Sequence, residues 1–136
     1  EKNIKPLYPF GHGLSYSQFE YSNLETNSTN YNVNDDVLVK IDVANTGKVD
    51  GKEIVQLYVK DQKSSVARPP KELKDFQKIH LKAGAKKTVY FTLQKRDFSF
   101  WDKNSESWKM EPGSFEIKVG ASSADVRLKN IIEIGK

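Results

Sequence analysis

The chain has 136 residues, which is the size of one domain. Hydrophobic residues make up 37% and charged residues 29%, so the composition is that of a folded globular domain and excludes an intrinsically disordered chain. The net charge of +4 is mild, and the lysines are scattered apart from an enrichment between Lys71 and Lys87. We therefore expect no nucleic acid as a partner. No apolar run approaches the roughly 20 residues of a membrane-spanning helix, so we expect no membrane partner either.

The chain starts with EKNIKPLYPF, without an initiator methionine or a basic and then apolar leader. We therefore expect it to be a piece of a longer protein. Cysteine is absent, which excludes disulfides, thiolate metal ligands and cysteine nucleophiles. A core of this size needs no disulfide in either compartment, so the absence of cysteine leaves the compartment open. For the longer protein we favour a periplasmic or secreted location over a cytoplasmic one.

The first 16 residues show no alternation of apolar and polar side chains. Pro6 and Pro9 interrupt any regular ladder of hydrogen bonds in this stretch. We expect an extended lead-in over residues 1–16 and the folded domain over residues 17–136. The polar stretch NSTNYNVNDD, residues 27–36, predicts a loop before the next strand.

Period-two alternation of apolar side chains marks five later runs. These runs are Val37, Val39, Ile41 and Val43; Val55, Leu57 and Val59; Val89, Phe91 and Leu93; Phe115, Ile117 and Val119; and Val126, Leu128, Ile132 and Ile134. Neighbouring side chains of a strand point to opposite faces, so each run predicts a strand with one buried and one wet face. On the second run we expect Gln56, Tyr58 and Lys60 to face solvent.

Two further segments have their own patterns. Phe76 is out of phase with Ile79 and Leu81, which predicts a bulge or a break at this point. The segment FSFWDKNSESWKM predicts a hairpin with its tip near Asn104 and Ser105. Helix signals are nearly absent, and we count about seven short strands. The fold class is therefore all-β, an antiparallel two-sheet sandwich, with a small barrel as the alternative.

The sequence offers no set of residues suited to catalysis. Glycoside hydrolysis needs two positioned carboxylates, roughly 5 to 10 Å apart in a cleft. The acids that we considered lie in turns or at outward strand positions: Asp35, Asp36, Asp50, Asp61, Asp102 and Glu106. His12 and His80 have no neighbouring ligands with metal-site spacing, and His80 should face solvent. We expect no catalytic, cofactor-binding or metal-binding residues.

Trp101 and Trp108 on the predicted hairpin allow two interpretations. Exposed aromatic rings serve as platforms in sugar-binding sandwiches. Aromatic rings also close the open end of a core, where they bury a large area. We favour packing, with both rings mostly buried or edge-packed, and keep a sugar platform as the alternative.

A distinctive set of stretches runs in a fixed order along nearly the whole chain. They are YPFGHGLSYSQFEYSNL (8–24), VANTGKVDGKEIVQLYVKD (43–61), SSVARPPKELKDF (64–76), LKAGAKKTVYFTL (81–93), FSFWD (98–102), residues 108–113 and FEIKVGASSADV (115–126). Their joint order resembles the C-terminal fibronectin type III-like domain of family three glycoside hydrolases, which include β-glucosidases and β-xylosidases. His12 and the KAGAKK turn depart from the usual pattern of such enzymes without altering the assignment.

The resemblance implies a fold and a context rather than an active site. It implies an immunoglobulin or fibronectin type III-like antiparallel β-sandwich, reached through the lead-in from preceding catalytic domains. Those domains supply the catalytic carboxylates in that family, and no residue of this chain matches the family's catalytic motifs. We therefore expect a non-catalytic accessory domain that packs against the catalytic domains of a parent hydrolase acting on β-linked sugars. The alternatives are a carbohydrate-binding module that recruits polysaccharide and a cell-surface adhesion module.

The expected docking face combines the apolar lead-in with a loop stiffened by prolines. Its residues are Tyr8, Phe10, His12, Leu14, Tyr16, Arg68, Pro69 and Pro70. Aromatic side chains of a non-alternating lead-in stay wet unless a partner covers them. The two prolines lower the entropy cost of one docked shape, and the forked donors of Arg68 suit carboxylates or carbonyls. The alternative is that the lead-in packs on its own sandwich and the prolines only shape a turn.

Overall fold

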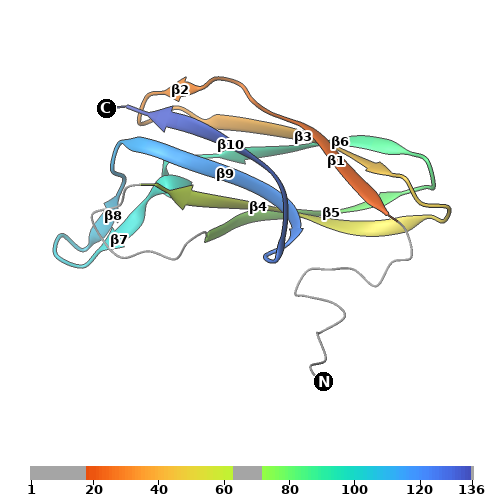
Figure 1. Ribbon diagram of the computed structural model, residues 1–136. Coiled ribbons are helices and arrows are strands. Elements are labelled where there is room, and N and C mark those ends of the chain that lie inside the picture. Colours follow the sequence, from red (N-terminus) through yellow and green to blue (C-terminus); the bar gives the residue numbers. More distant parts are fainter. Residues whose placement is uncertain (1–17, 63–71, 136) are drawn as a thin grey trace.

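The computed structural model describes residues 18–62 and 72–135 (Figure 1). These residues form strands and one short 3₁₀ helix. In chain order they are β1 (Phe19–Thr26), β2 (Asn30–Tyr31), β3 (Val37–Asn45), β4 (Gly51–Asp61), β5 (Glu72–Leu81), β6 (Lys86–Leu93), the helix η1 (Lys95–Phe98), β7 (Phe100–Asp102), β8 (Ser107–Lys109), β9 (Gly113–Ser122) and β10 (Asp125–Ile134). The expected lead-in lies outside the described residues.

Two sheets face each other across the core, and a small hairpin stands apart (Figure 1). One sheet has the order β1-β3-β6 and the other has the order β2-β10-β9-β4-β5, while β7 and β8 form a separate two-stranded sheet. Strand pairs are antiparallel except for β2 and β10, which pair in parallel through two residues. The strands of eight residues or more are β1, β3, β4, β5, β6, β9 and β10. The prediction of an all-β sandwich is confirmed. The alternative, a small barrel, is wrong because the strands form two separate sheets and not one closed sheet.

The core lies between the inner faces of the two sheets. Its largest fully buried side chains include Phe98, Phe115, Ile41 and Leu57. The inward faces predicted for β3, β4, β6 and β9 are confirmed, since all their alternating apolar residues are buried. On β10, Val126 departs from the prediction. The register of β9 and β10 shifts on both sides of it, and it is only partly buried opposite Gly120.

The outward face of β4 corrects the prediction for Gln56 and Tyr58. Both side chains are buried, with exposed fractions of 3% and 4%, although they point away from the inward residues Val55 and Leu57. The Tyr58 hydroxyl donates a hydrogen bond to Gln56 Oε1. The alternating pattern predicted a solvent-exposed face here, because such a pattern shows only which side chains share a face. It does not show whether other parts of the protein cover that face. Lys60 at the end of the run is partly buried.

Of the bulge or break expected at Phe76, the break is wrong, while a register shift typical of a bulge lies just before Phe76 in the same strand. Strand β5 runs without interruption through Phe76, which points to the outer face in regular alternation with the inward Ile79 and Leu81. The register shift between β4 and β5 lies earlier, where Leu57 pairs with Asp75 and Tyr58 pairs with Leu73. Phe76 was out of phase because it belongs to the other face of the strand.

Candidate functional surfaces

The docking residues expected from the sequence cannot be placed within the described ranges. Tyr8, Phe10, His12, Leu14, Tyr16, Arg68, Pro69 and Pro70 all lie outside the described residues. The strands that flank the loop are described: β4 ends at Asp61, and β5 begins at Glu72 opposite Val59 of β4. Gln62, just after β4, donates a backbone hydrogen bond to Ser114 at the start of β9. The strands before and after residues 63–71 are therefore direct neighbours in the five-stranded sheet.

The hairpin of β7 and β8 carries both tryptophans, as the sequence predicted. Trp101 and Trp108 are direct cross-strand partners, and the turn between the strands contains Asn104 and Ser105. Their indole rings meet edge to face with centroids 5.7 Å apart and planes at 74°. The expectation of burial is wrong, since the two residues are 50% and 46% exposed, whereas the expectation of edge packing holds. The hairpin lies outside both large sheets, and all of β8 is exposed, so little of the chain covers the rings.

Arg96 of η1 completes this aromatic cluster. Its guanidinium carbon lies 4.2 Å from the centroid of the Trp108 ring, a cation–π contact that occupies one ring face. A sugar platform uses flat ring faces that are open together. Here the two rings are steeply inclined, and one face of Trp108 is taken, so the arrangement does not form a continuous platform. Arg96 gave no sequence signal because the contact depends on how η1 meets the hairpin.

We expect the two tryptophans to report no sugar binding. Titration with cello- or xylo-oligosaccharides should leave the tryptophan fluorescence without saturable quenching, because the rings share no open flat face. Replacement of Trp101 by alanine should cost less than the about 3 to 5 kcal/mol of a fully buried ring, since half of the residue is exposed. The edge contact with Trp108 contributes about 0.5 to 1.5 kcal/mol of that cost. Saturable quenching at micromolar sugar, lost in the Trp101→Ala variant, would instead establish the platform.

Asp102 organises the turn of the hairpin. Its carboxylate accepts hydrogen bonds from Ser105 Oγ at 2.7 Å and from the Asn104 backbone N–H at 3.3 Å, and pairs with Lys109 Nζ at 3.1 Å. The hydrogen bond from Ser105 and then that from Lys109 lower the pKa of Asp102 from 3.8 to about 2. These bonds to the charged form hold the turn on which Glu106 adopts a φ of 51°.

The hairpin should lose order in acid before the core does. The folded pKa of Asp102 lies below the unfolded value, so its contribution is fully present above the unfolded pKa. It is lost as the pH falls from 3.8 through about 2. An NMR titration of the Asp102 side chain, with tryptophan indole N–H signals as the structural readout, measures this directly. In Ser105→Ala the Asp102 midpoint should rise, and an unchanged midpoint would contradict the assigned cause.

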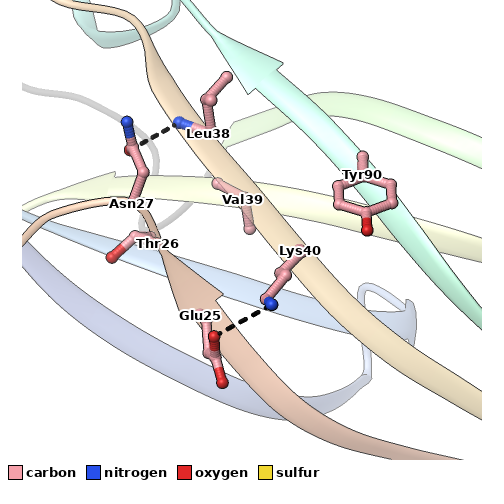
Figure 2. A pocket seen from close by; sticks show the side chains of 7 residues that line it. All are labelled: Glu25, Thr26, Asn27, Leu38, Val39, Lys40 and Tyr90. Atoms are coloured by element: carbon pink, nitrogen blue, oxygen red, sulfur yellow. Dashed lines mark hydrogen bonds and ion pairs between the residues drawn. The ribbon is translucent and has the colours of Figure 1, made fainter.

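A hollow of about 320 Å³ lies on the outer side of the three-stranded sheet (Figure 2). Leu38 and Tyr90, which are 48% and 65% exposed, contribute its apolar side. The ion pair of Lys40 Nζ with Glu25 Oε1, at 3.3 Å, lies beside them, and Asn27 Oδ1 accepts a hydrogen bond from the Leu38 backbone N–H. The one carboxylate that lines this hollow is that of Glu25, and it already pairs with Lys40. The hollow therefore offers no pair of carboxylates for hydrolysis.

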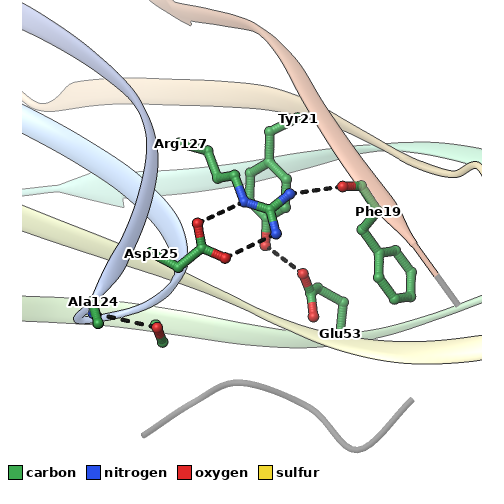
Figure 3. A network of polar contacts seen from close by, with 7 residues as sticks. Phe19, Tyr21, Glu53, Ala124, Asp125 and Arg127 are labelled. Carbon is green, nitrogen blue, oxygen red and sulfur yellow. Dashed lines mark hydrogen bonds and ion pairs between the residues drawn. The ribbon is translucent and has the colours of Figure 1, made fainter. Parts of the chain in front are cut away.

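A polar network ties the two sheets together (Figure 3). The Tyr21 hydroxyl of β1 donates to Glu53 Oε2 of β4 at 2.9 Å, and burial together with the Glu53 charge raises the pKa of Tyr21. Arg127 of β10 forms two hydrogen bonds to Asp125, donates to the Phe19 carbonyl at 2.7 Å and lies 5.1 Å from the Tyr21 ring. The Tyr21–Glu53 and Arg127–Phe19 hydrogen bonds join opposite sheets, and the Asp125 carboxylate holds the Arg127 side chain on β10.

The described residues hold no group of three or more side chains of the types that bind metals. Of the acids considered above, Asp35, Asp36, Asp50 and Glu106 are exposed, as is His80. In the described part of the chain no helix has the length and hydrophobicity required to cross a membrane. The described part of the chain thus presents two surface hollows, an aromatic hairpin and a polar network between the sheets.

Comparison with known proteins agrees with this architecture, a fibronectin type III-like β-sandwich. The family model of the fibronectin type III-like domain matches residues 53–123, and the chain belongs to this family. It is 50% identical over 133 residues to thermostable beta-glucosidase B of Acetivibrio thermocellus, covering 98% of this chain and 18% of that protein. It is 45% identical over 126 residues to beta-glucosidase BoGH3A of Bacteroides ovatus, covering 93% and 17%.

Solved structures give the same result. A β-glucosidase from Erythrobacter marinus superposes with a TM-score of 0.89 at 37% identity, covering 96% of this chain and 17% of that one. The Listeria innocua β-glucosidase in complex with glucose gives 0.84 at 40% identity, covering 97% and 18%. The chain thus corresponds to the small fibronectin type III-like domain of family three glycoside hydrolases and spans less than a fifth of these relatives, as the sequence resemblance implied.

Proposed function

We propose that this chain is a non-catalytic accessory domain that packs against and stabilises the catalytic domains of a parent hydrolase acting on β-linked sugars. The observation that carries the proposal is the extent of the match: nearly all of this chain corresponds to less than a fifth of each β-glucosidase. The hollow beside the three-stranded sheet is lined by one carboxylate, that of Glu25, which pairs with Lys40, and this supports the non-catalytic part. The inclined tryptophan rings weigh against the alternative, a module that recruits polysaccharide.

The first test is an enzyme assay of the isolated chain. We expect no hydrolysis of aryl β-glucosides or aryl β-xylosides above the buffer rate, because catalysis by two carboxylates needs a positioned pair. A rate that disappears when one Asp or Glu of this chain is replaced by its amide would contradict the proposal.

The second test addresses docking through the lead-in and the loop. Arg68→Ala and, separately, Phe10→Ala are made in the isolated chain and in the full-length parent. Docking predicts that Arg68→Ala leaves the melting temperature of the isolated chain nearly unchanged and lowers the stability or activity of the parent. An equal loss in both contexts would mean that Arg68 serves the sandwich itself, and docking through this loop would fall.

A further inference from the structure

We propose that the outer face of β4 and β5 is the surface that packs against the rest of the parent chain, and that it takes a partner surface with an apolar centre and acidic side chains. This inference rests on the proposed function and names the face and the chemistry of its partner. We call this surface the β4–β5 face. It consists of Lys52, Ile54, Leu73, Phe76, Lys78 and His80, with Lys82 beyond the end of β5.

The register of the two strands makes the apolar part of this face continuous. Phe76 pairs with Gln56 and lies diagonally next to Ile54, whose direct partner is Lys78. Leu73 pairs with Tyr58, the next outward residue of β4. Phe76 is 60%, Leu73 45% and Ile54 37% exposed. Between them Gln56 and Tyr58 are buried, so the exposed side chains surround a part of the face that is already dry.

Basic side chains line the other end of the same face. Lys52 of β4 pairs with His80 of β5 across the strands. Lys78 lies on β5 between Phe76 and His80, and Lys82 follows the end of β5. All of these are exposed, and the described residues provide none of the three lysines with an ion pair. Lys52, His80 and Lys82 line a hollow of about 410 Å³ together with Asp50, whose Oδ1 already accepts the Ala83 backbone N–H.

The charge and the position of this face identify the occupant. Lysines that have no ion pair within the described ranges, next to the exposed side chains of Ile54, Leu73 and Phe76, match a surface with carboxylates next to apolar side chains. Such complementarity fixes orientation and excludes other partners. Relatives carry several times the length of this chain, so the catalytic portion of a parent chain is a tethered partner at high effective concentration. The proline loop proposed for docking leads directly into β5, so both would reach the same partner.

The absence of cysteine allows a direct test. A cysteine is placed at Phe76, and its rate of reaction with a maleimide is measured in the isolated chain and in the full-length parent, with the site of labelling identified by peptide mapping. We expect the rate for Phe76→Cys to fall by about tenfold or more in the parent, because a thiol in a packed interface reacts only while the interface is open. Tyr90→Cys on the opposite sheet, where Tyr90 is 65% exposed, is the matched control and should react equally in both.

A charge arm tests the acidic character of the partner. In the parent, the double substitution Lys52→Glu and Lys78→Glu should restore much of the reactivity at Phe76→Cys, as should high salt, which screens exposed charges. Lys103→Glu at the exposed hairpin turn is the control and should leave the rate unchanged. Protection that is insensitive to both the charge changes and salt would overturn the acidic partner.

The other outcomes are distinguishable. Equal rates for Phe76→Cys in the isolated chain and the parent would overturn the β4–β5 face, while a loss of parent stability in Arg68→Ala would leave the proposed function standing. Protection that appears in the isolated chain and grows with its concentration would identify a second copy as the occupant and overturn the intramolecular partner.

Discussion

Replacement of Gly120 by alanine is expected to destabilise the sandwich by about 3 kcal/mol, the upper end of typical overpacking costs. An added Cβ would lie 2.2 Å from the Asp125 carbonyl oxygen and 2.8 Å from Val126 Cα. Both are backbone atoms of the neighbouring strand β10, so relief requires the two strands to separate at their register shift. Thermal unfolding of the isolated chain should show a melting temperature lower by about 10 °C for this cost in a domain of this size.

Gly135→Ala is the matched control for this substitution. The nearest atom to an added Cβ there is the Tyr31 carbonyl oxygen at 3.7 Å, which is ordinary contact. The free energy of unfolding of Gly135→Ala should differ from that of the unchanged chain by no more than about 0.5 kcal/mol, as for surface substitutions without a special role. Equal melting temperatures for the two variants would show that β9 and β10 accommodate a side chain at Gly120.

Replacement of Phe98 by alanine should cost about 3 to 5 kcal/mol, the usual range for a buried phenylalanine. Phe98 is 1% exposed and meets the fully buried Phe115 edge to face, with centroids 5.0 Å apart and ring planes at 69°. It belongs to the helix η1 rather than to either sheet, so its ring anchors the connection that leads to the tryptophan hairpin. Chemical denaturation followed by circular dichroism measures the loss.

The comparison for Phe98 is Phe76→Ala in the isolated chain. Phe76 is 60% exposed, and the same loss of atoms there should cost less than about 0.5 kcal/mol. A similar cost at both positions would mean that burial is not what distinguishes them. The pair also separates folding from docking, because the proposal assigns Phe76 a role only in the full-length parent.

The sandwich could be predicted from the sequence because its inner faces obey a local rule. Val37, Val39 and Ile41 alternate along β3 and are buried, as the pattern requires. The hairpin turn near Asn104 was also predictable, since its chemistry is confined to a few neighbouring residues. At Val126 the rule failed, because its register depends on the close approach of Gly120 on another strand.

The candidate surfaces were much less predictable because they depend on contacts between distant segments. The burial of Tyr58 and the contact of Arg96 with Trp108 cannot be inferred from the spacing of residues in the sequence. The exposure of Trp101 was misjudged for the same reason, since apolar neighbours in sequence do not show whether a hairpin folds back onto the core. The family resemblance supplied the context that residue patterns could not.

Strand β10 lies inside the five-stranded sheet, between β2 and β9, although it is the last strand in chain order. Ile132 and Ile134 near its end are buried in the core. Among the described strands, β9 therefore lacks its partner on one side and β2 lacks its partner until β10 leaves the ribosome. A nascent chain that stops short of β10 exposes a half-built core and an open sheet edge, which favour aggregation and degradation. The strand order thus makes folding wait for a complete domain.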